Sequence, residues 1–121
     1  MNAAALDVTL PFQASAEGAS GILTIDLQAL GCNYEKLSAL VAPGRAAAVV
    51  KADAYGLGAE RVARALYYKG CRHFFVAHYV EATRLRRVMA DDARMFVLNG
   101  LQPGSETSCA KAGIVPVVNS L

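Results

Sequence analysis

The sequence has little excess charge of either sign and no long apolar run. Its 121 residues include 12 basic and 10 acidic residues, and the net charge of +2 is too small to argue for nucleic-acid binding. The single basic cluster, Arg84, Arg86 and Arg87, is expected to be a solvated helix face. No apolar run approaches the ~18 residues of a membrane span. The first basic residue is Lys36, so the charged start of a secretory signal is missing. These absences favour a cytoplasmic protein that binds neither nucleic acid nor membrane.

Cysteine and histidine are scarce and scattered. Cys32, Cys71 and Cys109 are odd in number and widely spaced, which argues against a disulfide framework and against a zinc site. We expect them to be small buried hydrophobic residues. His73 and His78 have no cysteine or carboxylate at ligand spacing, and both are expected to be structural or exposed. No metal site is predicted.

Apolar residues are present in short, regular runs. They make up 55% of the chain, against 18% charged residues, which is a globular composition. Residues 1–21 combine proline and glycine with alanine and serine, and are predicted to be a flexible N-terminal leader. Residues 22–121 are predicted to form one unit in which strand and helix patterns alternate. The expected strands are residues 22–27, 46–50, 73–77, 95–98 and 114–118, and the expected helices are residues 27–41, 60–69, 80–89 and 105–112.

This alternation favours an α/β fold with a parallel sheet covered by helices. Right-handed crossovers can wind such units into an open sheet or a closed (β/α)8 barrel, and periodicity does not choose between them. No Gly-x-Gly-x-x-Gly motif follows the first strand, which argues against a dinucleotide-binding unit. Pro116 weakens the prediction of the last strand, because proline cannot donate a hydrogen bond to a ladder.

Lys51 is the residue that points to chemistry. It ends a short strand of alanine and valine, although lysine is among the residues least often buried. A lysine in apolar surroundings loses its proton more readily and becomes an amine nucleophile able to form a Schiff base. The alternative is a strand-end lysine whose ammonium group reaches water.

Two further polar residues follow Lys51 in a turn that contains two glycines. Tyr55 is placed to reach an anionic group at the C-terminal edge of the strands. The alternative is a tyrosine that covers the core with its hydroxyl in water. Asp53 is expected to accept hydrogen bonds from backbone donors of the turn.

The segment Ala48–Gly56, with the sequence Ala-Val-Val-Lys-Ala-Asp-Ala-Tyr-Gly, resembles the pyridoxal-phosphate attachment segment of alanine racemases. The resemblance implies that Lys51 carries the cofactor covalently, that Tyr55 contacts the cofactor's phosphate, and that the fold is a (β/α)8 barrel. Leu57 departs from the pattern, since the family commonly has histidine there. Weaker similarities extend over residues 22–121: they are Thr24-Ile25-Asp26-Leu27 with Asn33, Phe75-Val76-Ala77 with Glu81-Ala82, Phe96-Val97-Leu98-Asn99-Gly100, and Pro116-Val117-Val118-Asn119-Ser120.

Two apolar residues are candidates to line the cofactor pocket. Strand alternation points Val49 to the same side as Lys51, and Leu98 ends a later strand. The alternative for both is ordinary core packing.

The resemblance implies an enzyme that interconverts L- and D-alanine, supplies D-alanine for peptidoglycan and works as a homodimer. Lys51 would serve one face of the substrate, and the opposite base would be a tyrosine from a second, mostly β domain of the partner subunit. A whole barrel takes about 250 residues, so residues 22–121 are expected to be about half of the barrel domain, an N-terminal fragment that is inactive alone. The alternatives are a non-catalytic pyridoxal-phosphate-binding barrel protein and an inert truncation product.

Overall fold

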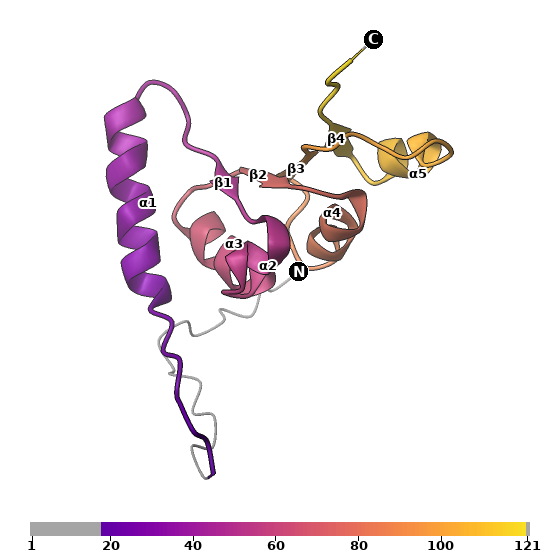
Figure 1. The fold of residues 1–121 in the computed structure, drawn as a ribbon. Coiled ribbons are helices and arrows are strands. Elements are labelled where there is room, and N and C mark those ends of the chain that lie inside the picture. Colours follow the sequence, from indigo (N-terminus) through magenta and orange to yellow (C-terminus); the bar gives the residue numbers. More distant parts are fainter. Residues whose placement is uncertain (1–17, 121) are drawn as a thin grey trace.

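The structure, a computed structural model, describes residues 18–120 and shows helices packed beside a short parallel sheet (Figure 1). Most of the expected leader, residues 1–21, lies outside the described residues. The strand predicted over residues 22–27 is wrong: residues 21–26 have no regular structure, and Ile22 and Leu23 are 71% and 77% exposed. A strand needs a neighbour for its backbone groups, and none of the described strands pairs with this segment.

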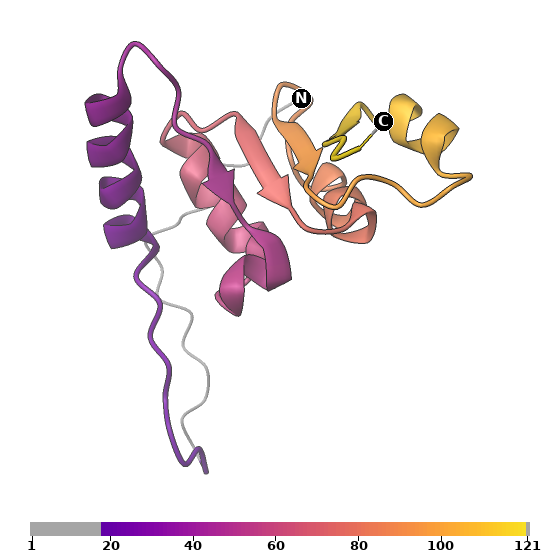
Figure 2. The ribbon, with the colours of Figure 1, turned by 45° about the horizontal axis from the view of Figure 1, so that its top comes forward.

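The remaining elements follow the predicted alternation. The sheet is parallel, with the order β1-β2-β3-β4, so each strand lies beside the next in the chain (Figure 2). The elements are α1 (Leu27–Val41), β1 (Ala48–Val49), α2 (Lys51–Tyr55), α3 (Ala59–Tyr68), β2 (His73–Val76), α4 (Tyr79–Arg86), β3 (Arg94–Val97), α5 (Glu106–Lys111) and β4 (Ile114–Pro116). Pro116 is tolerated because it is the last residue of an edge strand.

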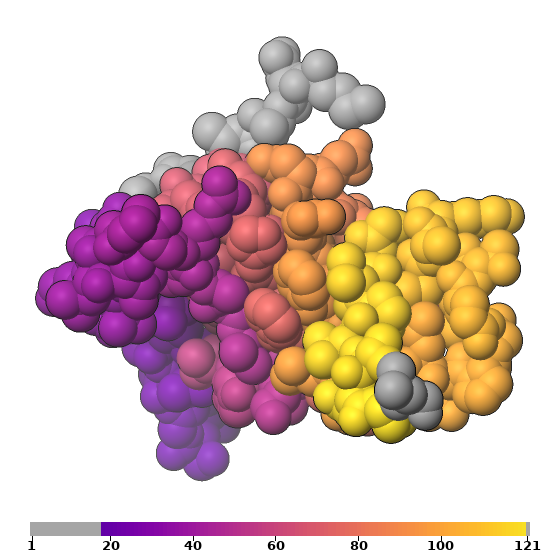
Figure 3. Space-filling view, turned by 90° about the horizontal axis from the view of Figure 1, so that it is seen from above, coloured from indigo at the N-terminus to yellow at the C-terminus, as the bar shows by residue number. Residues whose placement is uncertain are grey.

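Among the described residues, helices cover one face of the sheet and leave the other open. Figure 1 shows α3 and α4 below the strands, and Figure 3 looks onto the opposite face from above. Successive strand residues alternate between these two faces. Phe74 and Met95 are fully buried on the helix side, whereas Val49 is 47% exposed on the open side. Phe75 and Phe96 stack on each other across neighbouring strands of the open side, with ring centroids 4.6 Å apart.

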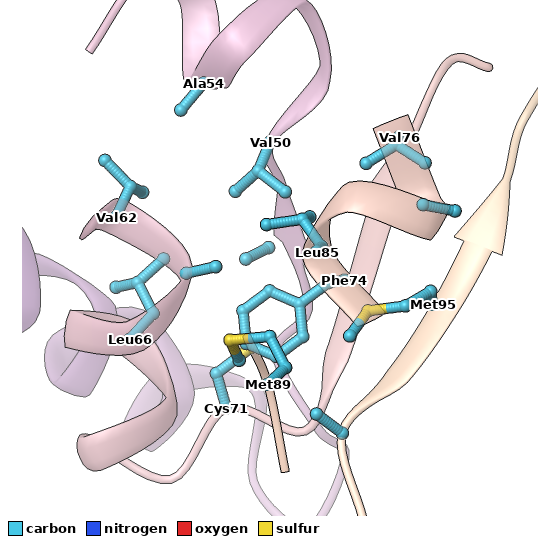
Figure 4. Packing of buried hydrophobic residues seen from close by; sticks show 14 of the residues in the cluster. Val50, Ala54, Val62, Leu66, Cys71, Phe74, Val76, Leu85, Met89 and Met95 are labelled. Atoms are coloured by element: carbon cyan, nitrogen blue, oxygen red, sulfur yellow. The ribbon is translucent and has the colours of Figure 1, made fainter. Parts of the chain in front are cut away.

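The core lies between the sheet and helices α3 and α4 (Figure 4). Phe74 lies at its centre, among side chains from both helices and from β1 and β3. Cys71 and Cys109 are buried there, as expected, and burial raises the pKa of each thiol. The same expectation is wrong for Cys32, which is exposed on α1. It follows Gly31, the buried residue that faces Lys69, by one helical position, which turns its side chain away from the packed face.

Helix α1 is only partly packed. The side chain of Asp26 caps its first turn by accepting a hydrogen bond from Ala29 N (2.9 Å). Leu27, Leu30 and Tyr34, which are spaced three and four residues apart, pack against the core. The same apolar spacing continues to Leu37 and Val41, but these two residues are 59% and 47% exposed. Figure 1 shows why: the C-terminal half of α1 extends beyond the sheet and α3.

Arg86 contradicts the prediction of a solvated basic face. Its guanidinium donates hydrogen bonds to the carbonyls of Ala93 (2.6 Å), Met89 (3.0 Å) and Ala90, so it binds carbonyls of the loop that joins α4 to β3. Arg84 and Arg87 are exposed, as expected.

A second polar cluster joins α3 to the loop before β3. The Tyr67 hydroxyl donates to Asp92 Oδ1 (2.7 Å), and Arg72 Nε bonds Asp92 Oδ2 (2.9 Å) while its guanidinium lies 4.0 Å from the centroid of the Tyr67 ring. The hydrogen bond from Tyr67, assisted by the charge of Arg72, lowers the pKa of Asp92. The same hydrogen bond raises the pKa of Tyr67.

Replacing Phe74 with alanine is expected to lower the free energy of unfolding by about 3–5 kcal/mol, because it empties the centre of the core. Phe75→Ala is the matched control, since it removes the same side chain from the open face of the same strand. It should cost far less, about 1 kcal/mol from the lost ring stacking. Urea denaturation of the purified variants measures both losses, and equal losses would contradict the one-sided core.

The Asp92 cluster predicts a pH dependence of stability. Because the folded-state pKa of Asp92 lies below its unfolded value, its contribution is present above the unfolded pKa and is lost as the pH falls through the folded pKa. Asp92→Asn should therefore lower the unfolding midpoint at neutral pH and flatten the loss of stability below about pH 4. Asp91→Asn, a neighbouring exposed carboxylate, is the control and should keep the parental acid profile. If stability depended on pH in the same way in both variants, the cluster would not be a source of the acid sensitivity.

Candidate functional site

The turn that follows β1 has an unusual backbone. Ala52, Asp53, Ala54 and Tyr55 of α2 all have positive φ, between 51° and 57°, so the chain makes a left-handed helical turn directly after Lys51. This conformation costs roughly 1–2 kcal/mol for each residue other than glycine and is rarely adopted by consecutive residues. The surrounding contacts must hold the turn in place.

The core anchors one side of the turn. Ala54 is 4% exposed, and Figure 4 shows its methyl group directed toward Val62. Its amide donates to the carbonyl of Val50 (3.0 Å). Gly56 ends the turn with φ at 87°, where a residue without Cβ is favoured. A small residue at position 54 therefore ties the turn to the hydrophobic core.

Asp53 anchors the turn to α3. Its Oδ1 accepts a hydrogen bond from the backbone N–H of Ala59 (2.7 Å), the first residue of α3, and its carbonyl accepts one from Gly58 (2.9 Å). The expectation that Asp53 satisfies backbone donors of the turn is confirmed.

Glu81 anchors the turn to α4, a role that the sequence analysis missed. Its Oε1 accepts a hydrogen bond from Ala52 N (2.7 Å), and its Oε2 accepts from Ala77 N (2.9 Å) and His78 N (2.8 Å). The bond from His78 N forms half of a capping box at the start of α4. The sequence could have indicated the cap, because Glu81 stands in the first turn of a helix that follows a strand. The hydrogen bond to Ala52 could not be foreseen, because it depends on how the fold places the two segments.

Lys51 stands at the C-terminal edge of the sheet. It is half-buried, and strand alternation places it with Val49 on the open face. Within residues 18–120 its amine has neither an ion pair nor a hydrogen bond. The amine is therefore available to a ligand that approaches the open face.

The other predicted site residues lie at the same edge. When the pairing register is continued past the ends of β1 and β3, Leu98, the residue after Val97, lies level with Lys51. The two residues are separated by the strand between them, β2. Leu98 is half-buried, and its carbonyl accepts a hydrogen bond from Asn119 Nδ2 (2.9 Å), which follows β4. Tyr55 is 64% exposed in the left-handed turn. The structure thus places Lys51, Val49 and Leu98 on the open face, and Tyr55 in the turn that follows Lys51.

These residues fit pyridoxal phosphate by their chemistry. An unpaired amine can condense with the cofactor's aldehyde, an exposed phenol can donate to its phosphate, and two apolar side chains can cover its ring. The described residues contain no group of three histidine, cysteine or acidic side chains that could hold a metal ion. None of the described helices combines the length and the apolar character that a membrane-crossing helix needs. A cleft of about 380 Å³ lined by Tyr34, Arg45 and Arg72 lies at the opposite end of the strands.

Known proteins resemble the chain along most of its length. The family model described as "Alanine racemase, N-terminal domain" matches residues 25–121. A catabolic alanine racemase of Rhizobium johnstonii is 71% identical over 106 residues, which cover 88% of this chain and 28% of the relative. An alanine racemase of Brucella ovis is 58% identical over 116 residues, which cover 94% of this chain and 29% of the relative. The chain thus spans less than a third of the length of these relatives.

Solved structures agree with the fold. The alanine racemase of Bartonella henselae, determined with covalently bound pyridoxal phosphate, has a TM-score of 0.77 and 47% identity over 79% of this chain and 27% of its own. That of Streptomyces coelicolor has a TM-score of 0.71 and 36% identity over 80% of this chain and 26% of its own. The parallel sheet is therefore part of a (β/α)8 barrel, the alternative that periodicity left open. The chain belongs to the alanine racemase family, and its residues 25–121 match the N-terminal domain of that family.

Proposed function

We propose that this chain forms the cofactor-binding part of a pyridoxal-phosphate-dependent racemase that interconverts L- and D-alanine. The observation that carries the proposal is Lys51, an amine without a partner among the described residues, at the end of a strand and followed by an anchored left-handed turn. The covalently bound pyridoxal phosphate named for the Bartonella henselae relative supports the cofactor.

Each residue at the edge has a distinct role in this proposal. Lys51 Nζ holds the cofactor and, once released by the incoming amino acid, moves the proton at the substrate's Cα on one face. Tyr55 donates its hydroxyl hydrogen to the phosphate. Val49 and Leu98 exclude water from the ring. The bound cofactor supplies an electron sink for the carbanion that forms when the α-proton leaves.

Racemisation needs a second group on the opposite face of the substrate. We propose that this group comes from the rest of the polypeptide, because the chain spans 28% of the Rhizobium johnstonii relative, and that the intact enzyme is a cytoplasmic homodimer. Residues 22–121 then form about half of the barrel domain, and the 121-residue chain by itself has no racemase activity.

The direction of net racemisation in the cell depends on which enantiomer of alanine is supplied and which is consumed. The reason is that two enantiomers of equal free energy interconvert with an equilibrium constant near one. We propose that the enzyme supplies D-alanine for peptidoglycan. The relative of Rhizobium johnstonii is named catabolic, so the breakdown of alanine as a nutrient is the alternative role. A deletion strain that requires added D-alanine supports the first role, and one that only fails to grow on alanine supports the second.

A hybrid enzyme tests the central proposal. In the hybrid, this chain replaces the matching segment of the Rhizobium johnstonii relative, to which it is 71% identical. The hybrid should be yellow and racemise alanine. Lys51→Ala should abolish the colour and lower the racemisation rate by about a thousandfold or more, because it removes the amine that binds the cofactor and moves the proton. Absorbance measures the loss of colour, and the rate at which the optical rotation of an alanine solution changes measures the loss of racemisation.

Lys36→Ala, on the exposed side of α1, is the control and should keep the parental rate. A Lys51→Ala hybrid that racemises alanine would refute the proposal. A hybrid that binds the cofactor at Lys51 without turnover would support the non-catalytic binding protein. A hybrid that binds none would support the inert truncation product.

Tyr55→Phe tests the phosphate contact. Removing the hydroxyl should weaken the binding of pyridoxal phosphate by the hybrid about 10- to 100-fold, since hydrogen bonds to charged groups contribute about 1.5–3 kcal/mol. The binding of pyridoxal, which lacks the phosphate, is the matched control and should not change. Fluorescence titration measures both affinities. An equal loss for the two ligands would place Tyr55 elsewhere than at the phosphate.

A further inference from the structure

Glu81 is the one side chain among the described residues that joins the backbone beside Lys51 to another strand and helix. Its carboxylate receives three backbone N–H groups: Ala52 at 2.7 Å, Ala77 at 2.9 Å and His78 at 2.8 Å. The first belongs to the left-handed turn, and the other two belong to the junction between β2 and α4. A single carboxylate therefore fixes the end of β1 relative to the end of β2.

The bond to Ala52 acts on Lys51 through a rigid unit. The peptide bond between Lys51 and Ala52 is planar, so the direction of the Ala52 N–H fixes the plane of the Lys51 carbonyl. On the other side, Val50 N donates to the carbonyl of Phe75 (2.8 Å). The backbone on both sides of Lys51 is thus held to β2 or to the helix that follows it, and the direction of the lysine's Cα–Cβ bond is set.

The left-handed turn explains why a side chain is needed here. With φ at 51°, Ala52 leaves the extended conformation of a strand, and its N–H bonds a carboxylate instead of a carbonyl of the neighbouring strand. Charged acceptors form the stronger hydrogen bonds, and Glu81 supplies one at the point where the strained turn begins.

We infer that Glu81 is a positioning residue for Lys51: it holds the lysine backbone so that the amine is directed at the carbon it attacks. This inference rests on the proposed function, because it assumes that Lys51 binds the cofactor. It assigns to Glu81 a role beyond capping α4.

Two substitutions separate positioning from capping. Glu81→Asp keeps a carboxylate in the first turn of α4 but shortens the side chain by one methylene, so it can cap the helix without reaching Ala52. Glu81→Ala removes both contacts. Glu106→Ala, which removes the carboxylate from the first turn of α5, is the matched control.

The test measures the covalent labelling of Lys51. The hybrid enzyme, stripped of cofactor, is mixed with pyridoxal phosphate, reduced with borohydride at intervals, and digested for mass spectrometry. Both Glu81→Asp and Glu81→Ala should slow labelling at Lys51 about 10- to 100-fold, the effect expected when a reacting group is misplaced by about 1 Å. Labelling at Lys36 and Lys111 should not change. Amide exchange of the peptide that contains residues 51–56 should become faster in both variants, whereas the peptide from α4 should change in Glu81→Ala alone.

The outcomes distinguish the inference from the proposed function. Parental labelling rates in both Glu81 variants would overturn the positioning role while leaving Lys51 as the cofactor lysine. A slow rate in Glu81→Ala with a parental rate in Glu81→Asp would also overturn it, since a capping carboxylate would then suffice. A parental hybrid that is never labelled at Lys51 would overturn the proposed function itself.

Discussion

The left-handed turn at residues 52–55 is the constraint on which the site depends. Four consecutive residues other than glycine adopt a conformation that costs roughly 1–2 kcal/mol each. Three contacts from different parts of the molecule offset this cost: the buried methyl group of Ala54, the bond from Ala59 to Asp53, and the bond from Ala52 to Glu81. The turn redirects the chain directly after Lys51, which leaves the lysine at the open edge of the sheet.

The position of the site follows from the one-sided sheet. Helices α3 and α4 cover one face and bury Phe74 and Met95, while the opposite face keeps Val49, Phe75 and Phe96 partly exposed. In a (β/α)8 barrel this opposite face lines the interior, and active sites lie at the C-terminal ends of the strands. Lys51 lies at that end, which agrees with the chemistry inferred for it.

Much of the fold was predictable because local patterns of apolar residues indicate where strands and helices form. The stretches around Val50, Phe74 and Met95 became the expected parallel strands, since their apolar runs suit a sheet buried by helices. The failures share a cause. The segment predicted as a strand at residues 22–27 pairs with none of the described strands, and the guanidinium of Arg86 binds carbonyls of the loop after α4 instead of remaining in solvent. Both outcomes depend on neighbours that a local pattern does not reveal.

The sequence by itself determined the alternation of strands and helices and the resemblance of the segment around Lys51 to a cofactor-attachment segment, because apolar periodicity and a specific run of residue types are local properties. Only the tertiary structure decided that Ala52 begins a left-handed turn and that Glu81, 29 residues later, holds its amide. Hydrogen bonds across such a separation depend on where the register of the sheet places the two segments. The contact between Glu81 and the backbone beside Lys51 is therefore visible only in the tertiary structure, whereas Lys51 itself can be singled out in the sequence.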